Sequence, residues 1–160
     1  MPSPAVTLTV DERRFNRAVQ AFLRRQAPAA VDRASRRIVF GVASRCVRDI
    51  TAGAVPRIDT GRYRAGWAMG TKQAIGKAPN APLSTDPKNP SRPGDGTGTK
   101  TGAMLSVTYT VANNVEYGPL LEYGTVSMAA GLHLAHALEG EGHVVARLVG
   151  GEVLRAWEGH

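Results

Sequence analysis

The sequence predicts a single α+β domain, and three patterns along its 160 residues lead to this prediction. Apolar residues recur at helical spacing over residues 12–51, alternate with polar residues over 105–112, and return to helical spacing near the C-terminus. A proline- and glycine-rich segment interrupts them. The expected architecture is two N-terminal amphipathic helices packed on a small antiparallel β-sheet, a long extended arm between strands, and a C-terminal helix.

The first predicted elements are a strand and a helix. Val6, Leu8 and Val10 alternate with threonines, which predicts a short edge strand over residues 5–10. Asp11 is the expected N-cap of the helix, because an aspartate side chain accepts hydrogen bonds from free backbone N–H groups. This helix should break near Pro28. Its apolar stripe comprises Phe15, Ala18, Val19, Phe22 and Leu23.

A second, longer helix is expected over residues 29–51, and Gly53 and Pro56 should end it. Its apolar residues recur at three- and four-residue steps and predict one buried stripe, while arginines occupy the opposite face. The stripe comprises Val31, Ala34, Ile38, Val42, Cys46 and Ile50, and the basic face comprises Arg33, Arg36, Arg37 and Arg48.

The middle of the chain is expected to form a sheet interrupted by an arm. After a turn at residues 57–60, alternating apolar residues predict a half-buried strand over 63–69, and a second strand is expected over 105–112. Residues 71–102 contain five prolines, five glycines and only two large aliphatic side chains, Ile75 and Leu83. Such a segment builds no core of its own and is expected to be an arm or a flexible loop.

The C-terminal third is expected to contain a turn and a helix. Residues 117–125 are expected to form a short aromatic-rich turn of helix or a loop, and helical periodicity begins near Leu134. Gly140 and Gly142 weaken the pattern. It then resumes at four-residue steps, with Val145, Val149, Val153 and Trp157.

The charge is unevenly distributed along the chain, whose formal net charge is +7. Residues 1–64 carry 13 arginines against five acidic residues. Arginines suit phosphate and carboxylate partners, so the basic segment indicates a polyanion or an acidic protein surface. The alternative is a solvated helix face in which arginines pair with acids such as Asp32 and Asp49. No aromatic residues are interleaved with the arginines, which argues against sequence-specific nucleic-acid recognition.

No motif predicts an active site, a cofactor or a metal, and we expect no enzymatic activity. In the glycine-rich segment 94–101, Thr99 precedes Lys100, where a phosphate-binding loop requires glycine. Cys46 lies on an apolar stripe, where a buried, unreactive thiol is the usual case. The histidines His133, His136 and His143 share a helix face with Glu139, but the nearby glycines favour exposed or interface histidines over a metal site.

The apolar content predicts no membrane span and no secretory leader, so we expect the chain to remain in a cytoplasm. Hydrophobic residues make up 42% of the chain, yet no apolar run approaches the roughly 18 residues that a membrane helix requires. The first ten residues contain no basic side chain and only a short alternating apolar stretch.

Four short segments occur in order: IDTGRYRAGW at 58–67, NVEY at 114–117, LEYGT at 121–125, and a stretch over 132–138 that opens the last helix. Together they resemble the neck or tail-completion proteins of long-tailed bacteriophages. The family pattern has three parts. The first is a DTGR-like turn that leads into a strand. The second is a tyrosine followed, after four residues, by glutamate, an aromatic residue, glycine and threonine, and the third is a helix start flanked by prolines. Here GLHLAHA at 131–137 replaces the proline-flanked start, and the arm is longer.

The resemblance implies a non-enzymatic virion protein that forms a ring, expected to be hexameric, between the head connector and the tail tube. The implied partners are other copies of the chain, the connector or stopper, the tail terminator or tail tube, and packaged DNA through non-specific contact. In this interpretation the protein assembles in the host cytoplasm and ends in the virion. A tail terminator or head-closure (stopper) ring is the alternative within this class, and a small basic nucleic-acid-binding protein is the alternative from another class.

The resemblance also indicates an assembly interface. Asp59 and Thr60 would cap a turn, and Gly61 would permit a backbone conformation that other residues resist. Gly124 would fix a bend that presents tyrosines as interface anchors, with ordinary core packing as the alternative role for those tyrosines. The predicted interface residues are Asp59, Thr60, Gly61, Arg62, Tyr117, Glu122, Tyr123, Gly124 and Thr125.

Overall fold

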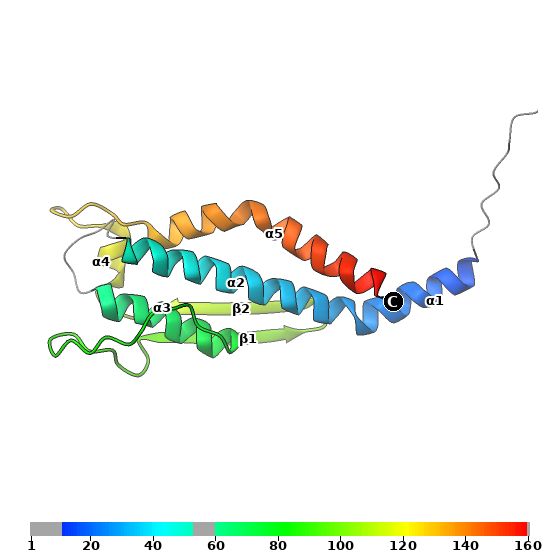
Figure 1. The fold of residues 1–160 in the computed structure, drawn as a ribbon, viewed down its shortest axis with the longest axis horizontal. Coiled ribbons are helices and arrows are strands. Elements are labelled where there is room, and N and C mark those ends of the chain that lie inside the picture. Colours follow the sequence, from blue (N-terminus) through cyan, green and yellow to red (C-terminus); the bar gives the residue numbers. More distant parts are fainter. Residues whose placement is uncertain (1–10, 53–59, 160) are drawn as a thin grey trace, which may run out of the picture.

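The computed structural model describes residues 11–52 and 60–159. A 25-residue helix, α2 (Ala27–Thr51), runs along the body of the protein, and α5 (His133–Glu158) packs beside it (Figure 1). The predicted weakness at the glycines does not interrupt α5, which is continuous over 26 residues.

On the other side of α2 lie α3 (Thr60–Ile75) and an antiparallel hairpin of β1 (Gly96–Ala103) and β2 (Ser106–Asn113) (Figure 1). The two strands pair in register along their whole length, with Gly96 opposite Asn113. The predicted α+β class is confirmed, and β2 corresponds to the strand predicted over 105–112.

α1 (Glu12–Arg25) projects from one end of this body (Figure 1). The Asp11 carboxylate accepts a hydrogen bond from the backbone N–H of Arg14 at 3.0 Å, which confirms the predicted N-cap. The helix ends at Arg25, and Pro28 lies in the first turn of α2, where its missing N–H costs no helical hydrogen bond. The strand predicted over residues 5–10 lies outside the described residues, as do the turn residues 57–59.

The strand predicted over residues 63–69 is wrong, because these residues belong to α3. The apolar residues of this segment alternate as in a strand, but its small residues recur at helical spacing. Gly66 and Gly70, one helical turn apart, face β1 so closely that backbone contacts backbone. A Cβ built on Gly96 would lie 1.8 Å from the carbonyl oxygen of Gly66, and one on Gly98 would lie 2.0 Å from that of Gly70.

The arm or loop predicted over residues 71–102 is shorter than expected, and it is a loop. Its first residues continue α3, its last residues form β1, and only residues 76–95 form a loop, which joins a helix to a strand rather than two strands. This loop folds back on itself, since the Ser91 N–H donates to the Ser84 carbonyl at 3.0 Å. It also contacts the body, because the Asn89 side-chain amide donates to the Tyr117 hydroxyl at 2.7 Å.

The hydrophobic core lies at the end of the body where α4 (Gly118–Tyr123) is found (Figure 1). Tyr63 and Trp67 of α3 meet there edge to face, with ring centroids 6.3 Å apart. The predicted stripe of α2 is buried only in part: Ala34, Cys46 and Ile50 are buried, and its other members are half-buried. The core cluster comprises Cys46, Val47, Ile50, Tyr63, Trp67, Val115, Leu121 and Ala137.

Candidate functional site

Arg62, one of the predicted interface residues, is buried in a network of ion pairs within the chain. Its guanidinium donates to both carboxylate oxygens of Asp95, at 2.9 and 2.7 Å, and to both of Glu116, at 3.1 and 2.9 Å. The fifth N–H donates to the Asn89 side chain at 3.2 Å. Arginine has five N–H donors, so every one is used. The hydrogen bond from Arg62 holds the pKa of Asp95 below its usual range.

The Arg62 network ties three segments together. Arg62 lies on α3, its partners Asn89 and Asp95 lie on the loop 76–95, and Glu116 follows β2. The sequence did not identify Asp95 and Glu116 as partners of Arg62. The only indication was their position as isolated acids, one before β1 and one after β2. Arg62 therefore fixes the loop to the body.

Glu122, another predicted interface residue, caps α5 from outside that helix. Its Oε1 accepts hydrogen bonds from the backbone N–H groups of Leu134 at 2.8 Å and Ala135 at 3.3 Å. Leu132, the N-cap residue, provides no side-chain hydrogen bond, so a carboxylate from α4 takes that place and also complements the positive end of the helix dipole. The side chain of Glu122 is buried.

Titratable side chains lie close together in the core beside Glu122. Burial raises the pKa of the Cys46 thiol to about 12 and also raises the pKa of the Tyr63 hydroxyl. His133 was expected to be exposed or at an interface, but the structure buries it, and this burial lowers its pKa. The thiol and the phenol therefore remain protonated at neutral pH, and Cys46 provides no thiolate nucleophile.

Three of the four arginines of the predicted basic face of α2 form ion pairs with acids of the same chain. The buried carboxylate of Glu152 on α5 lies 3.2 Å from Arg33 and 2.6 Å from Arg37, and it also contacts Arg155 at 2.8 Å. Arg36 pairs with Asp32 at 2.9 Å, as the alternative interpretation expected. The remaining member of the face, Arg48, is exposed.

Asp32 is the centre of a second cluster, which joins α2 to the hairpin. Its Oδ1 accepts a hydrogen bond from the Tyr109 hydroxyl at 2.5 Å and lies 2.7 Å from Lys100 Nζ. Partial burial raises the pKa of Asp32, but the hydrogen bonds from its neighbours outweigh this and bring the pKa to about 2.

The remaining predicted interface residues are placed as follows. Tyr123 and Thr125 are exposed, and Gly124 adopts a φ of +76° at the expected bend. Gly61 was expected in an unusual backbone conformation, but it is helical within α3, so that prediction is wrong. Asp59 lies outside the described residues, and of Thr60 only the backbone is described.

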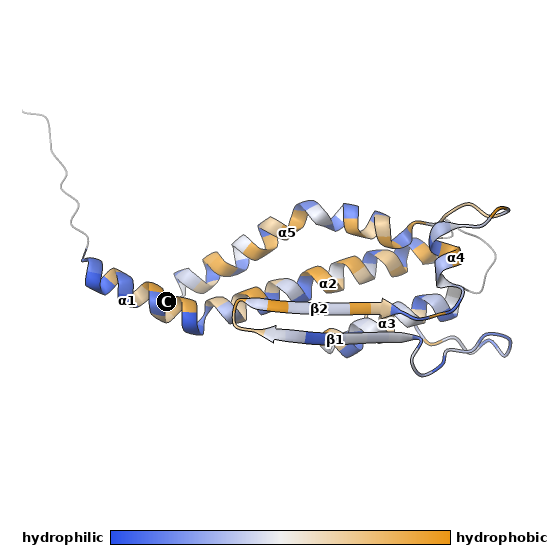
Figure 2. Cartoon of the chain, turned by 180° about the vertical axis from the view of Figure 1, so that it is seen from behind, coloured by the Kyte–Doolittle hydropathy of each residue, from blue (hydrophilic) through white to orange (hydrophobic). Residues whose placement is uncertain are grey.

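Large apolar side chains are exposed at both ends of the body. At the tip of the hairpin, Met104 and Leu105 are 63% and 50% exposed. At the other end, where α4 lies (Figure 2), is a set of exposed apolar side chains that we call the α4 surface. It comprises Leu120, Tyr123, Val126 and Leu132.

Within the described residues, no three histidine, cysteine, aspartate or glutamate side chains gather as a metal-binding group. No helix among those residues has both the length and the apolar character needed to cross a bilayer. No family model, curated protein or solved structure matches the chain.

Proposed function

We propose that this chain is a structural subunit that assembles with copies of itself into a ring at the head-to-tail joint of a bacteriophage. The observation that carries the proposal is the exposure of apolar side chains at the hairpin tip and at the α4 surface, on opposite ends of the body (Figure 2). A protein that works alone rarely leaves such side chains in water in groups. The ordered resemblance to neck and tail-completion proteins supports the same function.

The hairpin tip carries a second indication of a partner. Met104 has a φ of +55°, a conformation that costs a non-glycine residue about 1 kcal/mol. Two-residue hairpin turns favour Asn-Gly or Gly-containing pairs, which fit this backbone and are polar or small. The exposed Met104-Leu105 pair therefore does not suit the turn itself. Its two large apolar side chains suit a tip that is buried against another subunit.

We infer that the hairpin tip of one copy contacts the α4 surface of the next. A contact between two unlike surfaces of the same chain repeats head to tail and closes into a ring when the rotation per subunit allows it. A tail terminator or a stopper ring would use the same contact and would differ in its position along the joint.

The experiment is the mass of the full chain in solution, measured by analytical ultracentrifugation at micromolar concentrations. We expect a closed oligomer, with a hexamer as the resemblance implies. The double substitution Tyr123→Ser and Val126→Ser should shift the population to monomer, because it removes apolar area from the α4 surface without touching the core.

Leu83→Ser is the matched control, because Leu83 is 61% exposed but lies in the loop 76–95 outside both surfaces. It should leave the oligomer intact. A wild-type chain that stays monomeric at all concentrations would refute the ring. In the virus that encodes the chain, removal of the gene should yield heads and tails that fail to join, and infectious particles of normal form would refute the function.

A further inference from the structure

We propose that the polar face of α1 binds the phosphate backbone of duplex DNA without reading its sequence. This basic face, defined here as Arg13, Arg17 and Arg24, was not among the residues singled out from the sequence. The inference does not depend on the ring.

Helical geometry places these three arginines together. At 3.6 residues per turn, they lie within roughly 40° of one another around the helix axis, and opposite the apolar stripe that contains Phe15 and Phe22. They span about 16 Å along the axis. All three side chains are exposed.

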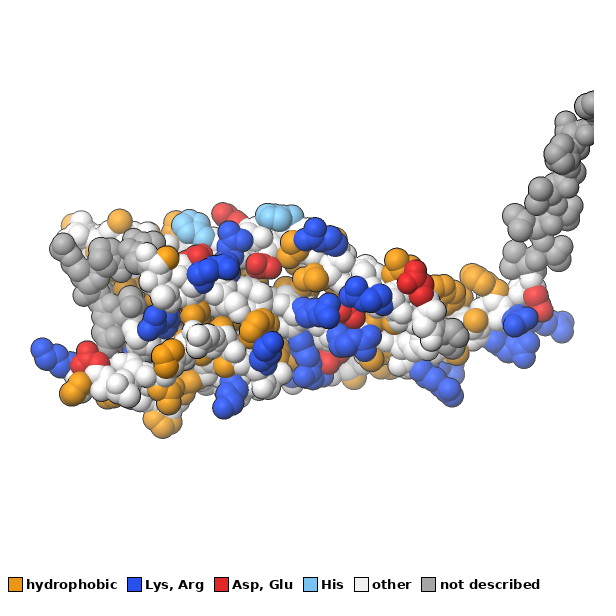
Figure 3. Space-filling view, in the orientation of Figure 1, with side chains coloured by type: hydrophobic (Ala, Val, Ile, Leu, Met, Phe, Trp, Pro, Cys, Tyr) orange, Lys and Arg blue, Asp and Glu red, His pale blue; other side chains and the backbone are white. Residues whose placement is uncertain are grey.

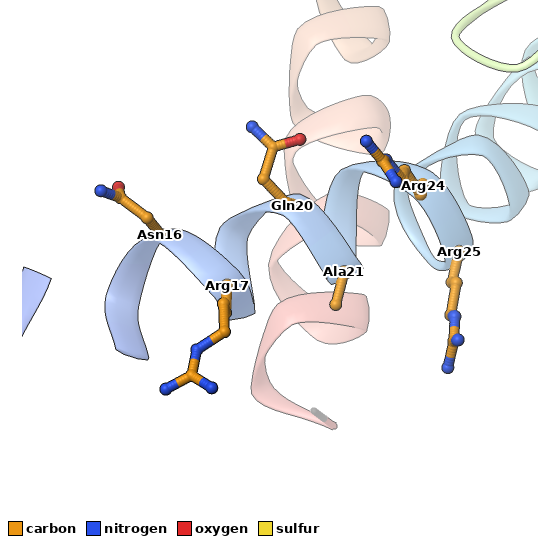
Figure 4. Close-up of a pocket in the computed structure, with 6 residues that line it drawn as sticks. All are labelled: Asn16, Arg17, Gln20, Ala21, Arg24 and Arg25. Carbon is orange, nitrogen blue, oxygen red and sulfur yellow. The ribbon is translucent and has the colours of Figure 1, made fainter. Parts of the chain in front are cut away.

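The surface of α1 between the arginines is a shallow hollow lined by two parallel rows of side chains (Figure 4). Asn16, Gln20 and Arg24 form one row, and Arg17, Ala21 and Arg25 form the other. Guanidinium groups donate two parallel hydrogen bonds to a phosphate, and side-chain amides add further donors. Aromatic side chains are absent from this lining, so the face offers contacts to phosphates and no platform for stacked bases.

The arginines of α1 differ from those of the body in their partners. Arg33, Arg36, Arg37 and Arg62 all form ion pairs with acids of the chain. Among the described residues, none of the five arginines of α1 forms an ion pair. On the face drawn in Figure 3, Lys and Arg side chains cluster on the projecting end and are also spread over the body. α1 therefore carries, within 14 residues, five arginines that no acid of the described chain pairs with.

The packing of α1 favours DNA over a lipid surface as the partner. An amphipathic helix binds a membrane by inserting its apolar face. In α1 the centre of that face is in use, because Phe22 is buried and packs edge to face on Trp157 of α5, with ring centroids 5.1 Å apart, whereas Phe15 and Leu23 beside it are exposed. The basic face points away from this contact and is exposed along its whole length.

The test measures binding of the full chain to a fluorescently labelled duplex of about 30 base pairs by anisotropy, over about 50 to 200 mM salt. Three phosphate contacts predict a slope of log K against log salt of about −2.7, or roughly a 40-fold loss of affinity across this range. Two duplexes of unrelated sequence should bind equally.

The decisive variant is the triple substitution Arg13→Gln, Arg17→Gln and Arg24→Gln. Glutamine has nearly the helix propensity of arginine, so α1 should persist. We expect the affinity at low salt to fall and the slope to flatten by about 0.9 for each arginine removed. The triple substitution to lysine should retain most of the binding, because the charges remain.

The matched control is Arg48→Gln, Lys88→Gln and Arg147→Gln, which removes three exposed charges outside α1. It should leave the slope almost unchanged. Equal losses in the two triple variants would show that net charge alone is responsible and would overturn the proposal, as would binding to phosphatidylserine vesicles but not to DNA. The oligomeric mass of each variant, measured in parallel, separates a failure of this inference from a failure of the ring.

Discussion

At the scale of single residues, the charged side chains divide into those that the fold neutralises and those that it leaves in water. Arg62 uses all five donors within the chain, and Glu152 accepts from arginines of two helices. These partners hold elements together. The arginines of α1 have no such role, which is why they are the ones assigned to an external partner.

Asp32 provides a test of these internal contacts by pH. Its pKa of about 2, against an ordinary 3.8, means that the unfolded chain binds the proton more tightly. The contribution of Asp32 to stability is therefore complete above about pH 5 and is lost as the pH falls towards 2. Asp32→Asn should lower the free energy of unfolding by about 2 kcal/mol at neutral pH and by little near pH 2.

Urea unfolding of the wild-type chain and of the variant at the two pH values measures this difference. Tyr109→Phe is a useful companion, because it removes one hydrogen bond to Asp32 and keeps the aromatic packing. An Asp32→Asn variant that is destabilised equally at both pH values would contradict the electrostatic explanation.

The sequence could not identify the partners of Arg62, because they are distant in the chain. Asp95 and Glu116 lie 33 and 54 residues away from it, and neither belongs to a periodic pattern. The same is true of Glu122, whose role depends on where α5 begins. The bend at Gly124 was predictable, because a local sequence of small and aromatic residues determines it.

At the scale of elements, the sequence was sufficient to predict a helix or a strand where one face of that element is exposed to water and the other is apolar. α1, α2 and β2 follow their apolar patterns, and Asp11 marks the start of α1 as predicted. The failures lie in α3 and β1, where contact depends on glycine. Hydrophobic periodicity carries no signal for a backbone that packs on another backbone, although the spacing of Gly66 and Gly70 was a usable hint.

Two glycine substitutions test this interpretation in opposite directions. Gly98→Ala would push a Cβ against the backbone of α3 and should lower the free energy of unfolding by about 3 kcal/mol. Gly142→Ala should raise it by about 1 kcal/mol, because no heavy atom lies within 4 Å of the new Cβ and alanine favours the helix. Chemical denaturation of both variants provides the measurement, and a neutral Gly98→Ala would contradict the close packing of β1 on α3.

At the scale of the whole molecule, the core is gathered at one end and exposed apolar side chains occupy both. The hairpin tip lies at the end of the body away from α4 (Figure 1). This separation excludes a contact between the two surfaces of one copy and leaves them available to two different neighbours. A chain with two unlike adhesive ends is suited to building rings.

The most direct test of this account mixes two variants that each lack one surface. One variant carries Met104→Ser with Leu105→Ser, and the other carries Tyr123→Ser with Val126→Ser. Each variant alone should be monomeric. Mixed in equal amounts, they should form a one-to-one heterodimer in native mass spectrometry, because each retains the surface that the other has lost. Two monomers that never associate, or a tip variant that still forms the full oligomer, would contradict the head-to-tail contact.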